Sequence, residues 1–137
     1  MSDVVTQVDY YYATVPDKPG EAARLLDQLR DAGVNLLAFS GFPEGRRSQL
    51  DFVPADGAAF TAVAKAAKIK LSRPKKVFMI NGDDRVGAVA EITGKLAAAK
   101  INITAVDAVR AGAGRYGAIL WVKPRDVKRA SAALGVM

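Results

Sequence analysis

Hydrophobic residues recur at the spacing of a strand in some segments and at the spacing of a helix in others. The order of these segments predicts the strands and helices of each half. In the first half, residues 8–15 are rich in Tyr and Val and are expected to form a strand. The sequence Asp17-Lys18-Pro19-Gly20 ends this strand and starts a helix, which Gly33 ends. Within that helix, apolar residues recur at the i, i+3, i+4 and i+7 spacing of one buried face: Ala22, Leu25, Leu26 and Leu29.

Two further strands, a second helix and a short last strand complete the first half. Residues 34–39 are expected to form a strand, Pro43-Glu44-Gly45 to turn the chain, and residues 50–53 to return it. Asp56 is placed to cap the second helix, and residues 69–71 follow it as the short strand. The second helix is expected to turn one apolar face inward: Phe60, Val63, Ala64 and Ala67.

After a connector at Ser72-Arg73-Pro74, the second half repeats the same order. The predicted elements are a strand at 76–80, a helix at 85–99, strands at 101–109 and 116–122, and a helix at 126–134. Only residues 135–137 follow that helix, so the last strand of this half is truncated. We therefore expect the second half to end on a weakly paired edge.

A shift of 67 positions superimposes the two halves. Over the 25 positions 15–39 and 82–106, seven residues are identical without a gap. These pairs are Asp17/Asp84, Gly20/Gly87, Ala23/Ala90, Leu29/Leu96, Ala32/Ala99, Asn35/Asn102 and Ala38/Ala105. The chain is therefore a tandem duplication, with a first domain at residues 1–72 and a second domain at residues 73–137.

The order of elements predicts the fold class. It is α+β, with two ferredoxin-like βαββαβ units in tandem, each an antiparallel sheet with its helices on one face. An unpaired second strand would expose a sheet edge, so we expect residues 34–40 and 101–109 to pair within the chain. Because this fold serves many functions, the function has to be inferred from the repeated polar residues.

Composition narrows the function classes. Half of the 137 residues are hydrophobic and a quarter are charged, which favours a folded core and excludes disorder. No run approaches the ~18 apolar residues of a membrane-spanning helix, and the first residues do not resemble a signal peptide, so we expect a cytoplasmic protein with no membrane partner. The sequence has no Cys and no His, which removes disulfides, thiolate zinc sites and the most common general base. We therefore expect a binding protein, with no enzymatic activity, metal or cofactor.

The net charge is +6, and part of it is concentrated in one short segment. Six cations fall between residues 65 and 76: Lys65, Lys68, Lys70, Arg73, Lys75 and Lys76. One interpretation is a patch that contacts phosphates of a nucleic acid. The other is a solvated helix end and connector, which is the more common origin of so short a basic cluster.

Two polar motifs recur in both copies at the same spacing. The first copy has Val15-Pro16-Asp17-Lys18-Pro19-Gly20 and then Gly33-Val34-Asn35-Leu36; the second has Gly82-Asp83-Asp84-Arg85-Val86-Gly87 and then Lys100-Ile101-Asn102-Ile103. This combination resembles the ACT domain, a small-molecule-binding module found on phosphoglycerate dehydrogenase, aspartate kinase and other amino-acid-metabolic enzymes. The resemblance covers both halves, and it departs from the family pattern at Val86, where the first copy has Pro19.

The resemblance implies a stand-alone regulatory protein that senses an amino acid or a related carboxylate. Free backbone N–H groups at a helix N-terminus beside a glycine can hold a carboxylate, and Asp and Asn oxygens can accept hydrogen bonds from an ammonium group. In the family the ligand commonly lies between two domains paired through their second strands, so we expect it at the interface between the two halves. The candidate ligand-binding residues are Asp17, Lys18, Pro19, Gly20, Asn35, Asp84, Arg85, Val86, Gly87 and Asn102.

Two alternatives stay open. In a purely structural interpretation, the aspartates of the two loops cap helices and the asparagines close turns. In the other alternative the second unit binds RNA, because residues 77–82 and 114–121 loosely resemble the two strand motifs of RNA-recognition domains. That match fails at Ala118, where a second stacking aromatic is usual, and the first copy lacks both motifs.

We also expect the chain to form a homodimer. Two small half-domains with a truncated last strand leave apolar surface that a chain of this length cannot cover, and two-fold association is the most common way to cover it. The candidate residues for that surface are Phe39, Phe42 and Trp121.

Overall fold

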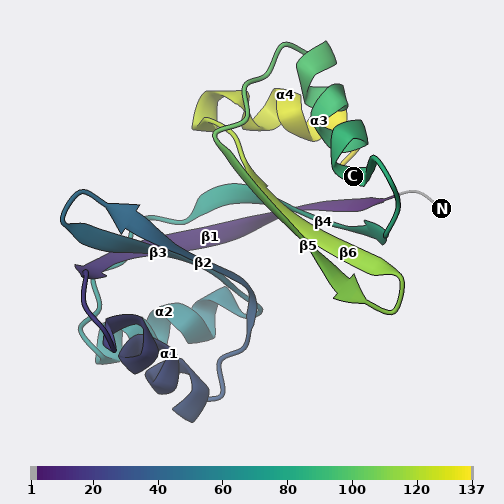
Figure 1. Ribbon diagram of the computed structural model, residues 1–137. Helices are drawn as coiled ribbons and strands as arrows, with labels where there is room; N and C mark the ends of the chain where they lie inside the picture. Colours follow the sequence, from purple (N-terminus) through teal and green to yellow (C-terminus); the bar gives the residue numbers. More distant parts are fainter. Residues whose placement is uncertain (1–2, 137) are drawn as a thin grey trace. The chain divides into compact units, whose positions relative to one another are not determined.

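The computed structural model describes residues 3–136 and divides into two compact units (Figure 1). One unit runs from Asp9 to Lys75, and the other combines the chain up to Val8 with the chain from Lys76 onward. The elements are β1 (Val4–Pro16), α1 (Glu21–Asp31), β2 (Leu36–Glu44), β3 (Arg47–Pro54), α2 (Gly57–Ala66), β4 (Lys75–Asp83), α3 (Ala88–Ala98), β5 (Ala105–Gly112), β6 (Arg115–Trp121), the 3-10 turn η1 (Pro124–Asp126) and α4 (Val127–Leu134).

In the Asp9–Lys75 unit, an antiparallel sheet of order β2-β3-β1 carries both helices on one face (Figure 1). Tyr11 lies opposite Phe52 in the β1–β3 ladder, and both side chains face the helices. The Phe60 ring from α2 lies 5.3 Å from the Tyr11 ring and 5.2 Å from the Phe52 ring. The buried core of this unit is Tyr11, Ala13, Val15, Leu25, Leu29, Leu50, Phe52 and Phe60.

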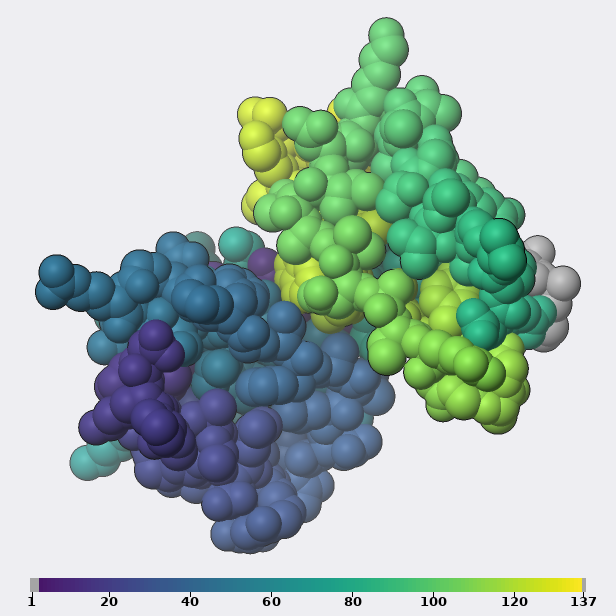
Figure 2. All heavy atoms as spheres, viewed as in Figure 1, coloured from purple at the N-terminus to yellow at the C-terminus, as the bar shows by residue number. Residues whose placement is uncertain are grey.

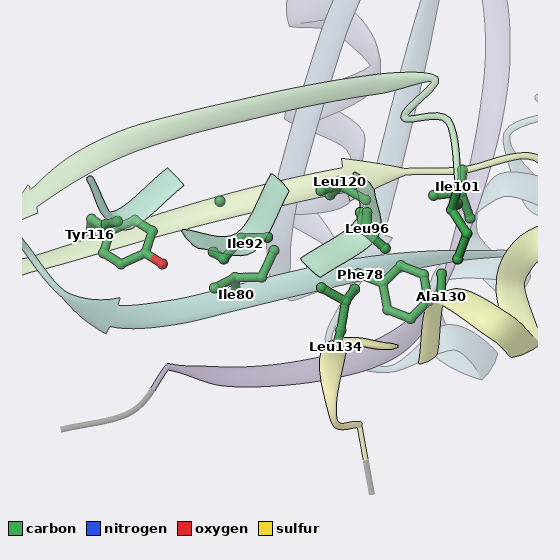
Figure 3. Close-up of a cluster of buried hydrophobic side chains, with 12 residues drawn as sticks. Phe78, Ile80, Ile92, Leu96, Ile101, Tyr116, Leu120, Ala130 and Leu134 are labelled. Carbon is green, nitrogen blue, oxygen red and sulfur yellow. The ribbon is translucent and has the colours of Figure 1, made fainter. Parts of the chain in front are cut away.

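In the other unit, β4, β6 and β5 form an antiparallel sheet whose core faces α3 and α4. Figure 3 shows Ile92 and Leu96 meeting side chains from β4 and β6, with Ala130 and Leu134 of α4 closing the cluster from their side. Phe78 and Ile80 of β4 both contribute to this core, because every second residue of a strand points to the same face. The βαββαβ-like α+β architecture expected from the sequence is thus the observed one.

Strand β1 belongs to both units. Its later residues pair with β3, whereas its first residues group with β4, and Val5 packs against the core around Phe78 and Leu120. The place beside β4 that a last strand would fill is therefore taken by the first residues of β1. The expected weakly paired edge is wrong for this reason, since β4 has β6 on one side and β1 on the other. The division into a domain at residues 1–72 and a domain at residues 73–137 describes the sequence repeat, and it stays a prediction.

The short strand expected at residues 69–71 is absent from the described structure, where these residues are irregular. The Ser72 amide donates to the Tyr12 carbonyl at 2.8 Å, but the Tyr12 amide donates to the Ser72 Oγ at 2.9 Å. A side chain therefore takes the bond that a backbone carbonyl would take in a ladder, and Pro74 close by has no amide to donate.

The second strands of the two copies, β2 and β5, do not pair with each other. In the hydrogen-bonded strand order β2 has β3 as its neighbour and β5 has β6, so the expected intrachain pairing of these strands is wrong. Strand β5 is exposed along its whole length and lies open on the surface in Figure 2. Exposed apolar side chains follow both strands: Leu37, Phe39 and Phe42 on β2, and Val106 and Val109 on β5. Trp121, by contrast, is buried, so it does not contribute to an apolar surface.

None of the helices within residues 3–136 has the length and apolar character needed to cross a bilayer.

Candidate functional site

The loop between β1 and α1 contains the first set of predicted site residues. Gly20 immediately precedes α1 in the left-handed region, with φ of 91°, which explains why a glycine stands there. Asp17 does not cap this helix; its Oδ1 accepts a hydrogen bond from the Ser48 Oγ at 3.0 Å. No side chain caps α1; the Glu21 amide donates to the Lys18 carbonyl at 3.5 Å, and the next amides of the first turn remain open to an anion from outside the helix. Pro19 is exposed beside them.

The equivalent loop before α3 has the same backbone but different side-chain contacts. Gly87 precedes the helix with φ of 83°, again without a side-chain cap. Asp84 forms an ion pair with Arg110 at 3.1 Å, and Val86 is fully exposed. The aspartates of both loops therefore contact side chains from neighbouring strands instead of capping the helices.

Each loop borders a small hollow, and the two hollows have equivalent linings. The first has a volume of about 270 Å³ and the second about 280 Å³. Seven pairs of lining residues are related by the 67-residue shift: 17/84, 18/85, 21/88, 22/89, 41/108, 42/109 and 43/110. An eighth pair follows from strand register, since Ser48 lies opposite Val15 in the first copy as Tyr116 lies opposite Gly82 in the second. The duplication has thus preserved a concave site at the start of each copy's first helix.

The cations at equivalent positions in the linings of the two hollows, Lys18 and Arg85, differ in their contacts. Within residues 3–136, Lys18 is exposed and makes no hydrogen bond or ion pair through its side chain. Arg85 at the same repeat position contacts Asp3 through both terminal nitrogens, at 3.0 and 3.2 Å, and also contacts Glu91. Only the first copy therefore presents an uncommitted cation to its hollow.

Asp3 was not among the residues predicted from the sequence. Its side chain is only 5% exposed, and the Arg85 guanidinium holds the pKa of its carboxyl below the usual range. Tyr116 lies beside it, and burial together with the Asp3 carboxylate raises the pKa of that phenol to about 12. One signal in the sequence could have indicated this cluster: Gly82 replaces the Val15 of the first copy at a core-facing position.

The asparagines lie away from the loops of their own copies. Asn35 precedes β2 and lines a separate hollow with residues of α1, whereas the Asp17 hollow contains Phe42 and Pro43 from the far end of that strand. Asn102 likewise precedes β5, and it is not among the residues that line the Arg85 hollow. Within one unit, the structure does not bring the predicted aspartate and asparagine together.

A second buried carboxyl lies in the Asp9–Lys75 unit. Asp51 is 4% exposed, and burial raises the pKa of its carboxyl although Gln49 Nε2 donates to it at 2.9 Å. Burial, with the nearby Asp51 charge, also raises the pKa of Tyr10 to about 12. Among residues 3–136, no group of three or more acidic side chains is arranged to hold a metal ion.

The aromatic residues of the RNA-binding alternative are buried. Phe78 and Tyr116 belong to the helix-facing core, and Trp121 is 6% exposed. Base stacking requires ring faces that are open to solvent, so these side chains offer no stacking platform.

The chain shares its fold with solved structures of low sequence identity. No protein-family model and no curated protein sequence matches the chain. Protein BT0572 from Bacteroides thetaiotaomicron has a similar structure, with a TM-score of 0.82 and 15% identity over 96% of this chain and 88% of that one. The regulatory subunit of aspartate kinase from Thermus thermophilus, in its ligand-free form, has a TM-score of 0.66 and 19% identity, with coverages of 98% and 94%. The structure of aspartokinase alpha and beta subunits has a TM-score of 0.63 and 20% identity, with coverages of 98% and 95%.

Proposed function

We propose that this protein is a non-enzymatic regulatory protein that binds a free amino acid, or a related small carboxylate, in the hollow beside its first loop. The observation that carries the proposal is the duplicated hollow, which in both copies lies against the uncapped start of a helix. Its volume, about 270 Å³ in the first copy, suits a ligand smaller than a drug-sized molecule. The fold shared with the regulatory subunit of an aspartate kinase supports a regulatory role.

The first hollow offers a partner to each end of an amino acid. The open amides at the start of α1 and the Lys18 ammonium both favour a carboxylate. The Asp17 carboxylate has lone pairs left after accepting from Ser48, and these favour an ammonium group. Phe42 forms part of the apolar lining, against which a ligand side chain can pack.

The asparagine enters this site through a homodimer. In an antiparallel pair of β2 strands, the start of one strand lies beside the end of the other. Asn35, just before β2, would thereby approach the Asp17 hollow of the partner molecule, which contains Phe42 and Pro43 from the end of β2. The exposed Leu37, Phe39 and Phe42 favour such pairing, because unpaired apolar edge strands tend to associate.

A thermal-shift screen of the twenty protein amino acids tests the proposed ligand class. A ligand present at a hundredfold excess over its dissociation constant adds about 2.7 kcal/mol to the free energy of unfolding. Asp17→Ala and Asn35→Ala should each weaken the binding of the amino acid identified in the screen by about 1.5–3 kcal/mol, without unfolding the chain. Asp27→Ala is the matched control, because Asp27 lies on the exposed side of α1 and forms an ion pair with Arg30, which is also exposed.

Three outcomes would contradict the proposal. An RNA-induced shift with no shift from any amino acid would favour the RNA-binding alternative. Unfolding of Asp17→Ala would favour a structural role for the loop. A single species near 14.5 kDa in sedimentation equilibrium would remove the homodimer and with it the role of Asn35.

A further inference from the structure

We propose that Asp3 is an internal ligand of the second loop, whose carboxylate occupies Arg85 and closes that loop to the carboxylate of a metabolite. The consequence for ligand binding rests on the proposed function: each chain has one open metabolite site, at Lys18, although the site is present twice. Asp3 and Arg85 are 82 residues apart in sequence and lie in the same compact unit.

The terminal nitrogens of Arg85 have no remaining hydrogen to offer. Nη1 donates to Asp3 Oδ1 at 3.0 Å and to the Asp83 carbonyl at 2.9 Å, while Nη2 donates to Asp3 Oδ2 at 3.2 Å and to Glu91. Each terminal nitrogen of a guanidinium carries two hydrogens, so both are fully used. A carboxylate that binds these terminal nitrogens would have to displace Asp3, Glu91 or the Asp83 carbonyl.

The backbone around Arg85 is shaped to receive this carboxylate. A Cβ at Gly82 would lie 1.9 Å from Asp3 Oδ1 and 2.9 Å from Tyr116 Cε1, so Asp3 fills the space that only glycine leaves. The Asp3 side chain is 5% exposed in that space, whereas Arg85 is 31% exposed. Asp3 is thus held on several sides rather than lying loosely on the surface.

The first copy lacks each part of this arrangement. Val15 stands at the position of Gly82, and Arg24 stands at the position of Glu91 and so would repel the Lys18 cation. Arg24 contacts Glu21 instead, at 3.3 Å. Gly82 and Glu91 thus have no counterpart in the first copy, and within residues 3–136 no carboxylate forms an ion pair with Lys18, although Asp17 and Glu21 line the same hollow.

Arginine modification tests the contact without any metabolite. In the wild-type chain, phenylglyoxal should modify Arg85 about tenfold more slowly than the exposed Arg73, because a bidentate carboxylate holds the guanidinium in its bonded state. Asp3→Asn should bring the Arg85 rate close to that of Arg73. Gly82→Ala should do the same by displacing Asp3 with every charge retained, and Asp27→Asn is the control that should leave the rate unchanged. Equal Arg85 rates in the wild type and Asp3→Asn would overturn the proposal.

Nitrogen-15 NMR with a mixture of the twenty protein amino acids at millimolar concentration tests the consequence. In the wild type, the amides of Gly20 and Glu21 should shift while those of Gly87 and Ala88 do not; in Asp3→Asn both pairs should shift. Shifts at Gly87 in the wild type would overturn the closed second loop. If no amide shifts with any amino acid, the proposed function fails, and the phenylglyoxal rates still decide whether Asp3 occupies Arg85.

Discussion

Lys18 and Arg85 stand at the same repeat position, one residue after the loop aspartate and two before the loop glycine, yet their surroundings differ in kind. Around Lys18 the loop is exposed, and its aspartate accepts a hydrogen bond from a serine hydroxyl. Around Arg85, a carboxylate from the beginning of the chain and another from α3 converge on the guanidinium. The backbone of the two loops is nonetheless alike, including the left-handed glycine before each helix.

Under the proposed function, this difference means that the duplicated site is used in two ways. An open helix start and a cation form a site for any carboxylate, whether it comes from a small molecule or from the chain. An internal carboxylate has a high effective concentration, so it occupies its site without a free ligand. The second copy thereby gains a contact that fastens the start of β1, while the first copy keeps its site open.

A large-to-small substitution in the core of one unit has the largest expected effect on stability. It also tests whether β1 contributes to both units. Phe78 is fully buried in the core that also contacts Val5, so Phe78→Ala should destabilise the protein by about 3–5 kcal/mol. Hydrogen exchange should show faster exchange at Val4–Val8 than in the wild type. Phe60→Ala, in the core of the other unit, should cost about as much but spare those amides. Equal loss of protection at residues 4–8 in both variants would contradict the assignment of β1 to two cores.

Two glycine substitutions in the unit that contains β4 and α3 should change the free energy of unfolding by smaller amounts and in opposite directions. Gly82→Ala places a methyl group against Asp3 and Tyr116, and we expect a loss of about 1–3 kcal/mol from overpacking. Gly94→Ala lies inside α3 with open space around it, and we expect a gain of about 0.5–1 kcal/mol from helix propensity. Urea denaturation measures both; a neutral Gly82→Ala would mean that Asp3 is not confined.

Substitutions of the two buried carboxyls, Asp3 and Asp51, should have the smallest effects on the free energy of unfolding, and these effects should differ in sign. The pKa of Asp3 is lowered in the folded state, so its ion pair stabilises the protein above the unfolded pKa of about 3.9 and the gain is lost as the pH falls through the lowered value. The pKa of Asp51 is raised, so its carboxylate destabilises the protein at neutral pH, and the cost disappears as the pH falls through the raised value towards about 3.9.

At pH 7, Asp3→Asn should therefore lower the free energy of unfolding by about 1 kcal/mol, a figure that allows for solvent around Arg85. Asp51→Asn should raise it by about 1 kcal/mol, because the amide still accepts from Gln49 without a buried charge. Urea titrations at pH 7 and pH 3 measure both differences, which should shrink at the lower pH. A stabilising Asp3→Asn at pH 7 would contradict the ion pair, and a destabilising Asp51→Asn would show that its charge is compensated.

Of the candidate site, the sequence predicts the polar loop and the helix that follows it, and it does not predict the side chains that contact the loop. The spacing of Asp17, Gly20 and their counterparts indicates a polar loop before a helix, and that helix starts after the glycine in both copies. The helix expected to begin at Arg85 begins at Ala88, because Gly87 adopts a left-handed conformation that a helix interior excludes. The partners of the loop aspartates, Ser48 and Arg110, come from other strands and have no local signal.

The sequence by itself determined the repeat, the order of the helices and of the longer strands, and the inward faces of the first half's helices, because these depend on periods of two and about 3.6 residues that are local in the sequence. Only the tertiary structure decided that the start of β1 completes the second unit, that β2 and β5 pair with β3 and β6 alone, and that Asp3 reaches Arg85. The physical reason is that strand pairing and ion pairing join residues far apart in the chain. Any exposed edge or carboxylate could have made those contacts, and the packing of the whole chain selects among them.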